Sequence, residues 1–395
     1  MQELRQIEVI IRSMKTVIAA MKTKRAGEED LRNVQLTTDD INHILYHAKK
    51  LKFQKEHNPE SEEGYRDYIE ETEKLVSLWE QTVQRRRGKT TDTVFWDTYE
   101  YFKYVDTNTI YQSVVKHFME LPEGMRIEYL ALPHRYVFLK NKIDFTQGDF
   151  SLIAEHVEMM ACKVEKYKWL YEHLADYRSK AVLNGIIRYW FDFDLNGLQG
   201  LCETLFSDYY DLDILDCSED EVIVDLGAFT GDSVLGYIGT YDAYKKIYAY
   251  EITPGPYESL VKNVSGYPNI IPVQKGVSSQ KGKMFVRSDG SQGAGNRLSD
   301  DGDMEVEVVT LDEDITEPVT LIKMDIEGAE KDAIMGAASH IKADRPKMLI
   351  SSYHLSEDIF EIPCLINSIC DDYKFYMRYN GHGSIWPCDY VLFAV

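Results

Sequence analysis

The chain has 395 residues, of which 44% are hydrophobic, so it is long enough for two or three domains with their own cores. Its formal net charge is −22, and the excess of acid is concentrated in the second half. From Asp216 to Val395 there are 30 acidic against 15 basic residues, which accounts for −15 of that charge. Because so acidic a region repels phosphate backbones, we do not expect nucleic acid as a partner.

The cysteines and the N-terminus indicate a reducing compartment. Six cysteines show neither a C-x-x-C pair nor the histidine spacing of a zinc site, which favours free thiols and argues against structural zinc. No apolar run approaches about 18 residues, and the first residues are too charged for a signal peptide. We therefore expect a cytoplasmic protein without a membrane span.

Residues 1–90 are predicted to form a helical region. Apolar residues from Leu4 to Met21 recur three or four apart, which gives a helix with one apolar stripe. Acidic residues share the polar face, and no Trp or Phe lies on the apolar one. The stripe therefore favours a bundle seam, a partner contact or a homodimer contact over a membrane anchor. Two further helices are expected, one from about residue 41 and one over 58–87.

Residues 91–168 are predicted to be an aromatic-rich, mainly helical region. Aromatic side chains crowd together between Phe95 and Tyr111, and such a group more often builds a core than binds a sugar or base. A short hairpin is expected over 135–145. Two or more helices follow over 150–189, and those from Trp169 onward form a lead-in to the last domain, 169–395.

The core of that domain, residues 216–395, alternates strands with helices. This pattern predicts an α/β fold with a mostly parallel sheet covered by helices on both faces. An excursion with two strands interrupts the alternation, and an antiparallel pair closes the chain. The expected strands are 222–226, 247–251, 270–277, 284–287, 304–310, 319–324, 347–351, 374–379 and 390–395.

The stretch E-V-I-V-D-L-G-A-F-T-G-D-S, which begins at Glu221, reads as a strand, a glycine turn and a helix start. Glycine there lets a ligand approach the backbone, and the first helical turn offers N–H groups to an acceptor. The turn lacks the second glycine of G-x-G-x-x-G, since Ala228 replaces it, and Asp225 would repel a pyrophosphate. These differences favour S-adenosylmethionine over NAD.

The carboxyl ends of the other strands add polar side chains at the same edge of the sheet. Glu251 ends the second strand and can accept hydrogen bonds from both hydroxyls of a ribose. Asp325 and Glu327 follow the fourth strand, and His354 follows the fifth. Four carboxylates in one crevice suit a ligand with hydroxyls, amines or a positive charge.

Five segments of the second half stand out: E-V-I-V-D-L-G-A-F-T-G-D-S at Glu221, I-Y-A-Y-E at Ile247, V-V-T-L-D at Val308, L-I-K-M-D-I-E-G-A-E at Leu321 and S-S-Y-H-L-S-E-D-I at Ser351. Together they resemble the FkbM family of S-adenosylmethionine-dependent O-methyltransferases. The resemblance covers about residues 206–395, and K-M-D-I-E-G-A-E within the fourth segment is its most specific part. It implies a class I methyltransferase (Rossmann-like) fold, with a seven-stranded, mostly parallel sheet that ends in an antiparallel hairpin.

The resemblance also implies roles for residues around the cofactor. Glu251 would hold the ribose, and Gly276 and Val277 the adenine edge. Asp325 and Glu327 would face the sulfonium and the acceptor, so Asp325 counts as both a cofactor-binding and a catalytic residue. The methionine end would be held by Asp225, Gly227, Ala228, Gly231 and Ser233.

His354 is the candidate base, because a hydroxyl must lose its proton as it attacks the methyl group and histidine titrates near neutral pH. The alternative is a histidine that only hydrogen-bonds a neighbouring loop. Asp325 and Glu327 could equally be helix N-terminal carboxylates. Asp325, Glu327 and His354 also have the donor types for magnesium or manganese. The sequence does not favour a metal.

We therefore interpret the chain as an O-methyltransferase that transfers a methyl group to a hydroxyl of a sugar, glycan or secondary metabolite. An N- or carboxyl-methyltransferase would have the same fold and cofactor site and is the alternative enzyme. A scaffold with an inactive cofactor domain is the alternative outside enzymes. The retained acids Asp225, Glu251 and Asp325 argue against the scaffold. The acceptor is not identified by the sequence.

Overall fold

The computed structural model describes residues 91–135, 150–206, 208–287, 297–299, 302, 304–381 and 387–395. Residues 1–93 and 94–395 form separate compact units, and nearly all of the first lies outside the described residues. The helices and dimer contact predicted before residue 90 lie outside them too. So does the hairpin predicted over 135–145, except Arg135, which ends a helix.

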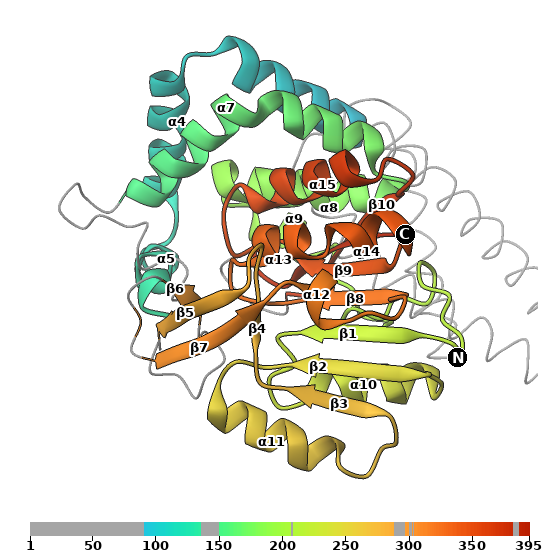
Figure 1. Cartoon of the computed structure of the whole chain (residues 1–395). Helices are drawn as coiled ribbons and strands as arrows, with labels where there is room; N and C mark the ends of the chain where they lie inside the picture. The colour runs from blue at the N-terminus through green and yellow to red at the C-terminus, as the bar shows by residue number, and fades with distance from the viewer. Residues whose placement is uncertain are drawn as a thin grey trace, which may run out of the picture. The chain divides into compact units, whose positions relative to one another are not determined.

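The central sheet has seven strands in the order β10-β11-β9-β8-β1-β2-β3 (Figure 1). The five strands from β9 to β3 are parallel, and β11 runs antiparallel to both β9 and β10. This confirms the predicted α/β fold with a mostly parallel sheet and a closing antiparallel pair. The strands are β1 (Val222–Leu226), β2 (Lys246–Tyr250), β3 (Ile270–Val273), β8 (Leu321–Met324), β9 (Lys347–Ser351), β10 (Phe375–Tyr379) and β11 (Tyr390–Ala394).

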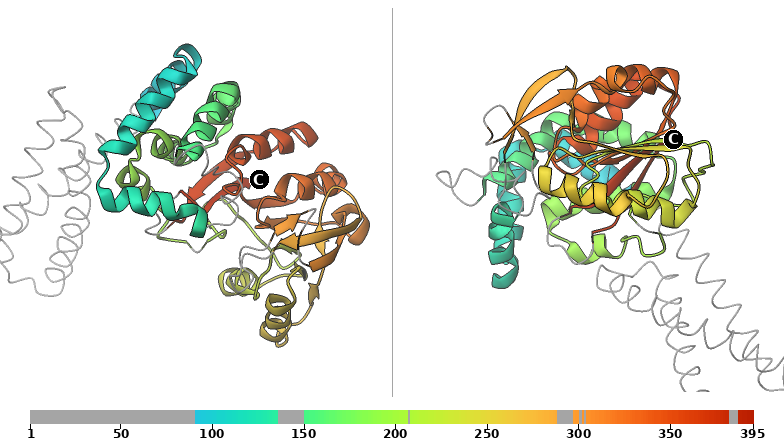
Figure 2. Two further views of the ribbon diagram at one scale, coloured as in Figure 1. Left: turned by 90° about the vertical axis from the view of Figure 1, so that its left-hand side faces the viewer. Right: turned by 60° about the horizontal axis from the view of Figure 1, so that its bottom comes forward.

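Helices cover both faces of this sheet, which is why β1 and β8 are buried along their whole length. Val224 and Ile322 pack into the core shared with α13, α14 and α15, whereas Ile223 packs into the core shared with α10 and α11. Figure 2 shows α11, in yellow, lying against one face of the sheet. The helix predicted over 329–341 is divided at Ala337. The helices are α10 (Asp232–Tyr241), α11 (Pro254–Val264), α13 (Glu330–Gly336), α14 (Ala338–Ala343) and α15 (Asp358–Ile369).

A second sheet has the order β4-β7-β5-β6 and contains the predicted two-stranded excursion. The single strand predicted over 270–277 is wrong, because β3 ends at Val273 and Gly276 pairs with Val308 in the second sheet. β3 is the edge strand of the central sheet and pairs with β2 on one side, so the chain can leave this sheet after Val273. The elements are β4 (Gly276–Val277), β5 (Gly282–Arg287), β6 (Arg297–Ser299), β7 (Met304–Val309) and α12 (Leu311–Asp314).

The helical residues before the sheet pack around aromatic side chains. Phe95, in the helical stretch 91–104, is fully buried and stacks on Tyr171 with ring centroids 3.8 Å apart. Helices α4, α7 and α15 lie side by side (Figures 1 and 2). Across the last pair, Lys163 Nζ lies 2.5 Å from Glu361 Oε1. The helices are α4 (Thr107–Glu120), α5 (Glu123–Arg135), α7 (Ser151–His173), α8 (Tyr177–Asp192) and α9 (Leu195–Gln199).

A buried arginine joins these helices to the edge of the sheet. Arg378, in β10, donates from Nε to Asp211 at 2.7 Å and from Nη2 to Asp176 at 2.9 Å. Asp176 also caps the N-terminus of α8 by accepting from the Ser179 amide. The lead-in helices and the sheet therefore pack as one body. None of the helices in the described part of the chain is long and apolar enough to cross a membrane.

Candidate functional site

A cavity of about 300 Å³ lies at the carboxyl ends of β1, β2 and β8. β1 and β8 are neighbours in the sheet although they are far apart in the chain, so the strand order reverses between them. Open parallel sheets bind ligands at such a reversal, and the volume is within the range of small-molecule sites. Its polar lining includes Asp208, Asp232, Ser233, Glu251, Lys275, Lys323, Asp325, Glu327, Asn380 and Asp389.

The glycine turn after β1 is shaped by contacts within the protein. Gly227 has φ +78° and Gly231 has φ +90°, a backbone region that favours glycine. A Cβ atom on Gly227 would lie 1.9 Å from the Asp325 carbonyl oxygen, and one on Gly231 would lie 3.1 Å from Leu260. The amides of Gly227 and Ala228 both donate to the Tyr250 carbonyl. These glycines therefore allow the turn to pack closely against its neighbours. The sequence had suggested a different reason, namely that glycine lets a ligand approach the backbone.

Asp225 forms a buried ion pair that sequence reasoning missed. Its carboxylate lies 3.0 Å from Lys323 Nζ and accepts a hydrogen bond of 2.5 Å from Ser233 Oγ. Burial alone would lower the pKa of Lys323, but Asp225 and Asp325 hold it above its ordinary value. Asp225 does not line the cavity, whereas Lys323 does. A single lysine in an otherwise apolar strand, β8, was the signal that could have identified this pair.

Glu251 enters the cavity directly after β2. Its Oε2 accepts from the Phe229 amide at 3.1 Å, and its Oε1 accepts from the Thr253 amide at 2.7 Å. Burial raises the pKa of this carboxyl, and the two amide bonds oppose that shift. The Thr253 side chain also hydrogen-bonds this carboxyl. A carboxylate has about four lone-pair sites, so the side chain is held in place and can still accept a bond from a ligand.

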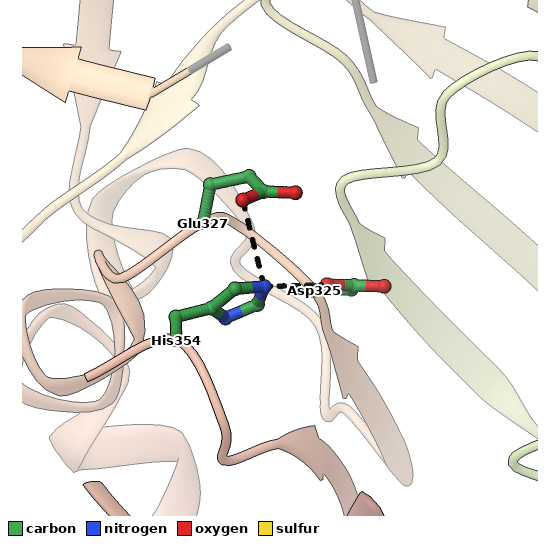
Figure 3. A group of neighbouring side chains, drawn as sticks. All are labelled: Asp325, Glu327 and His354. Atoms are coloured by element: carbon green, nitrogen blue, oxygen red, sulfur yellow. Dashed lines mark ion pairs between the residues drawn. The ribbon is translucent and has the colours of Figure 1, made fainter. Parts of the chain in front are cut away.

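Asp325, Glu327 and His354 lie together at the ends of β8 and β9 (Figure 3). His354 Nε2 is 3.3 Å from Asp325 Oδ1 and 3.7 Å from Glu327 Oε2. The histidine is fully buried, whereas the two carboxylates are partly exposed and line the cavity. Glu327 has φ +57°, a left-handed backbone conformation that few non-glycine residues adopt. The three predicted catalytic residues are thus neighbours.

Two residues that the sequence analysis did not select hold this group in place. Tyr209 donates its hydroxyl proton to Asp325 Oδ2 at 2.7 Å. Glu330 is buried, with Oε1 2.9 Å from His354 Nδ1 and accepting from the Ile326 amide at 3.0 Å. A glutamate in the first turn of a helix usually faces solvent, so the sequence carried no sign of this contact.

The opposite charges within this group stabilise one another and outweigh the effect of burial on the pKa of each residue. Burial alone would lower the pKa of His354, but Glu330, Glu327 and Asp325 hold it well above its ordinary value. Burial alone would raise the pKa of Asp325, but His354 and Lys323 hold it well below its ordinary value. An ionised Asp325 and a positively charged His354 are therefore the favoured forms near neutral pH.

The predicted site residues occupy two layers. His354 lies behind the cavity wall formed by Asp325 and Glu327. Most of them lie at the carboxyl edge of the central sheet, and Gly276 and Val277 belong to β4 of the second sheet. Only part of the set reaches the cavity. Those that line it are Gly227, Ser233, Glu251, Gly276, Val277, Asp325 and Glu327, and those that lie outside the lining are Asp225, Ala228, Gly231 and His354.

A comparison with protein families matches residues 225–381 to the family model described as the Methyltransferase FkbM domain. The predicted FkbM family is thereby confirmed for this part of the chain, residues 225–381. A search of curated proteins finds no match.

Among solved structures, the methyltransferase FkbM from Methylobacillus flagellatus KT is similar, with 22% identity and a TM-score of 0.51. The match covers 61% of this chain and 62% of the Methylobacillus protein, so this chain spans less than two thirds of that protein's length. The likeness shows the fold. An rRNA methylase from Streptococcus thermophilus has 13% identity over 45% of this chain and 87% of its own, with a TM-score of 0.29. Fibrillarin from Aeropyrum pernix, solved with natively bound S-adenosyl-L-methionine, has 13% identity over 45% and 67%, with a TM-score of 0.29.

Proposed function

We propose that this chain, which carries an FkbM methyltransferase domain at residues 225–381, is an S-adenosylmethionine-dependent O-methyltransferase. The proposed acceptor is a hydroxyl of a sugar, glycan or secondary metabolite. The observation that carries the proposal is the buried Glu251 carboxylate, held by two backbone amides at the cavity wall beside the Gly227 turn.

The cavity residues fit such a cofactor in both shape and charge. Glu251 can accept the two ribose hydroxyls, and Gly276 and Val277 line the wall that we assign to the adenine. Asp325 and Glu327 place negative charge where a sulfonium would lie. The Asp225 and Lys323 pair supports the turn from behind, so we now assign Asp225 a positioning role.

The chemistry requires alignment of an acceptor oxygen and removal of its proton. When bound, S-adenosylmethionine supplies an electrophilic methyl group on its sulfonium. Asp325 and Glu327 face the cavity and can hold an acceptor hydroxyl by accepting its hydrogen bond. We assign removal of the proton to the group formed by Asp325, Glu327 and His354. A hydroxyl-rich acceptor suits the carboxylates that line this side of the cavity.

Replacing Glu251 with glutamine is expected to weaken binding of S-adenosylmethionine by about tenfold or more, because a charged hydrogen bond to the ribose is lost. Glutamine has nearly the same volume but offers only one acceptor oxygen. Calorimetric titration of the cofactor into the full chain measures the change.

The matched control is Glu317→Gln. Glu317 pairs with Lys246 at the other end of β2 and does not line the cavity. We expect this variant to bind the cofactor as the parent chain does. Equal affinity of the parent and Glu251→Gln would remove Glu251 from the cofactor site.

A further inference from the structure

Three potential metal-binding side chains converge at the cavity wall. Asp325, Glu327 and His354 each offer one ligand atom, and these three atoms all lie within 4.8 Å of one another. Asp325 and Glu327 come from the loop after β8, and His354 comes from the loop after β9. Two different loops therefore deliver the three atoms to one point, as Figure 3 shows.

The spacing of these atoms is close to that of ligands on a single ion. Bonds of about 2.1 Å at right angles place neighbouring ligand atoms about 3.0 Å apart. The corresponding distances from His354 Nε2 are 3.3 Å to Asp325 and 3.7 Å to Glu327. All three atoms lie within 4.8 Å of one another, so shifts of about 1 to 2 Å in the flexible carboxylates would complete the set, on the order of ordinary side-chain motion.

The far side of the histidine is arranged as in many metal sites. Glu330 Oε1 lies 2.9 Å from His354 Nδ1, and both side chains are fully buried. A carboxylate at one ring nitrogen fixes the ring orientation and the tautomer that leaves the other nitrogen for a metal. Glu330 is itself fixed by the Ile326 amide, so Nε2 is directed toward Asp325 and Glu327.

The same group has an open side. Asp325 and Glu327 line the cavity, so an ion held between them and His354 would have its remaining coordination positions directed into the cavity. Three protein ligands with open positions are typical of catalytic rather than structural metal sites. Carboxylates suit Mg²⁺ and Mn²⁺, and imidazole suits the later first-row metals, so the mixed set favours Mn²⁺.

We propose that Asp325, Glu327 and His354 bind a divalent cation, for which Mn²⁺ is the best match, and that this cation takes the acceptor hydroxyl. The second part rests on the proposed methyltransferase function. His354 releases its Nε2 proton to water when the ion binds, because only the neutral ring has a lone pair for a metal. The hydroxyl proton passes to a carboxylate of the same group and then to water as the oxygen binds the cation. An oxygen lone pair then forms the O–C bond to the methyl group, the S–C bond breaks, and its electron pair stays on sulfur. The cation stabilises the oxygen's negative charge before attack.

Titration of Mn²⁺ into the full chain without cofactor, followed by the electron paramagnetic resonance signal of free Mn²⁺, tests the binding. We expect saturable binding of one ion. Glu327→Gln should weaken it by about tenfold or more, and Glu330→Gln by roughly tenfold through the histidine. Thermal unfolding of each variant verifies that it is folded. Glu327 lies in a loop and is partly exposed, so its substitution leaves the core intact.

The matched control is Asp232→Asn, because Asp232 lines the same cavity from the start of α10 and is not part of the group. We expect its Mn²⁺ affinity to equal that of the parent chain. Absence of saturable Mn²⁺ binding, or equal weakening by Asp232→Asn and Glu327→Gln, would overturn the proposal and leave an ion-pair cluster.

Methyl transfer by the chain after chelation, with and without added Mn²⁺, separates this inference from the proposed function. Restoration by Mn²⁺ supports both. If the chelated chain transfers the methyl group at the full rate, the metal proposal is overturned and the proposed methyltransferase function stands. One-site Mn²⁺ binding without any binding of S-adenosylmethionine overturns the proposed function and leaves the metal site.

Discussion

Replacing Lys323 with methionine is expected to lower the free energy of unfolding by about 3 to 5 kcal/mol. Lys323 is almost fully buried, lies 3.0 Å from Asp225 and donates to the Gly227 carbonyl at 2.8 Å. Methionine fills a similar volume but leaves the Asp225 carboxylate buried without its counter-charge. Denaturant unfolding of the two proteins measures the difference.

Two further variants show whether the buried charge is responsible. Lys283→Met removes the partner of Glu305 from an ion pair that is mostly exposed, and we expect it to change stability little. Asp225→Asn in the Lys323→Met background should recover part of the loss, because it removes the unpaired charge. A Lys323→Met protein as stable as Lys283→Met would contradict the importance of the buried pair.

Replacing His354 with glutamine is expected to lower turnover by about 100-fold or more, while the affinity for S-adenosylmethionine changes by less than about threefold. His354 lies behind Asp325 and Glu327, outside the cavity lining, so the cofactor itself should not contact it. Glutamine keeps a donor for the surrounding carboxylates but loses the imidazole. Single-turnover rates and calorimetry measure the two quantities separately.

His340→Gln is the control, since His340 is another buried histidine with a carboxylate partner, Asp344, at 2.6 Å. It lies in α14, outside the cavity lining, so we expect turnover per folded molecule to stay at the parent level. Unchanged turnover in His354→Gln would exclude His354 from catalysis, whether as a base or as a metal ligand.

The sheet and the residues at the strand ends beside the cavity follow directly from local sequence patterns. Parallel strands buried on both faces are continuous apolar runs, so their ends could be read from the sequence. Residues at those ends, such as Glu251 and Asp325, then fall at one edge by topology alone. The break between β3 and β4 could not be read in this way, because Gly276 pairs with Val308, more than 30 residues later in the chain.

The second layer of the site could not be predicted, because burial there depends on partners from distant segments. Lys323 and Glu330 are charged residues that ordinarily face solvent, and each is buried here against an opposite charge from another element. His354 was selected for its place after a strand, but its depth behind two carboxylates follows from the packing of two loops. The sequence thus indicated the residue types and not their layering.

Transfer of a labelled methyl group tests the central claim most directly. The full chain is incubated with methyl-labelled S-adenosylmethionine, Mn²⁺ and fractions of a cell extract, and the labelled product is identified by mass spectrometry and NMR. We predict a product in which the label is a methyl ether on a hydroxyl of a sugar, glycan or secondary metabolite. Absence of transfer to every fraction, or label on a nitrogen or a carboxyl group, would contradict the O-methyltransferase account.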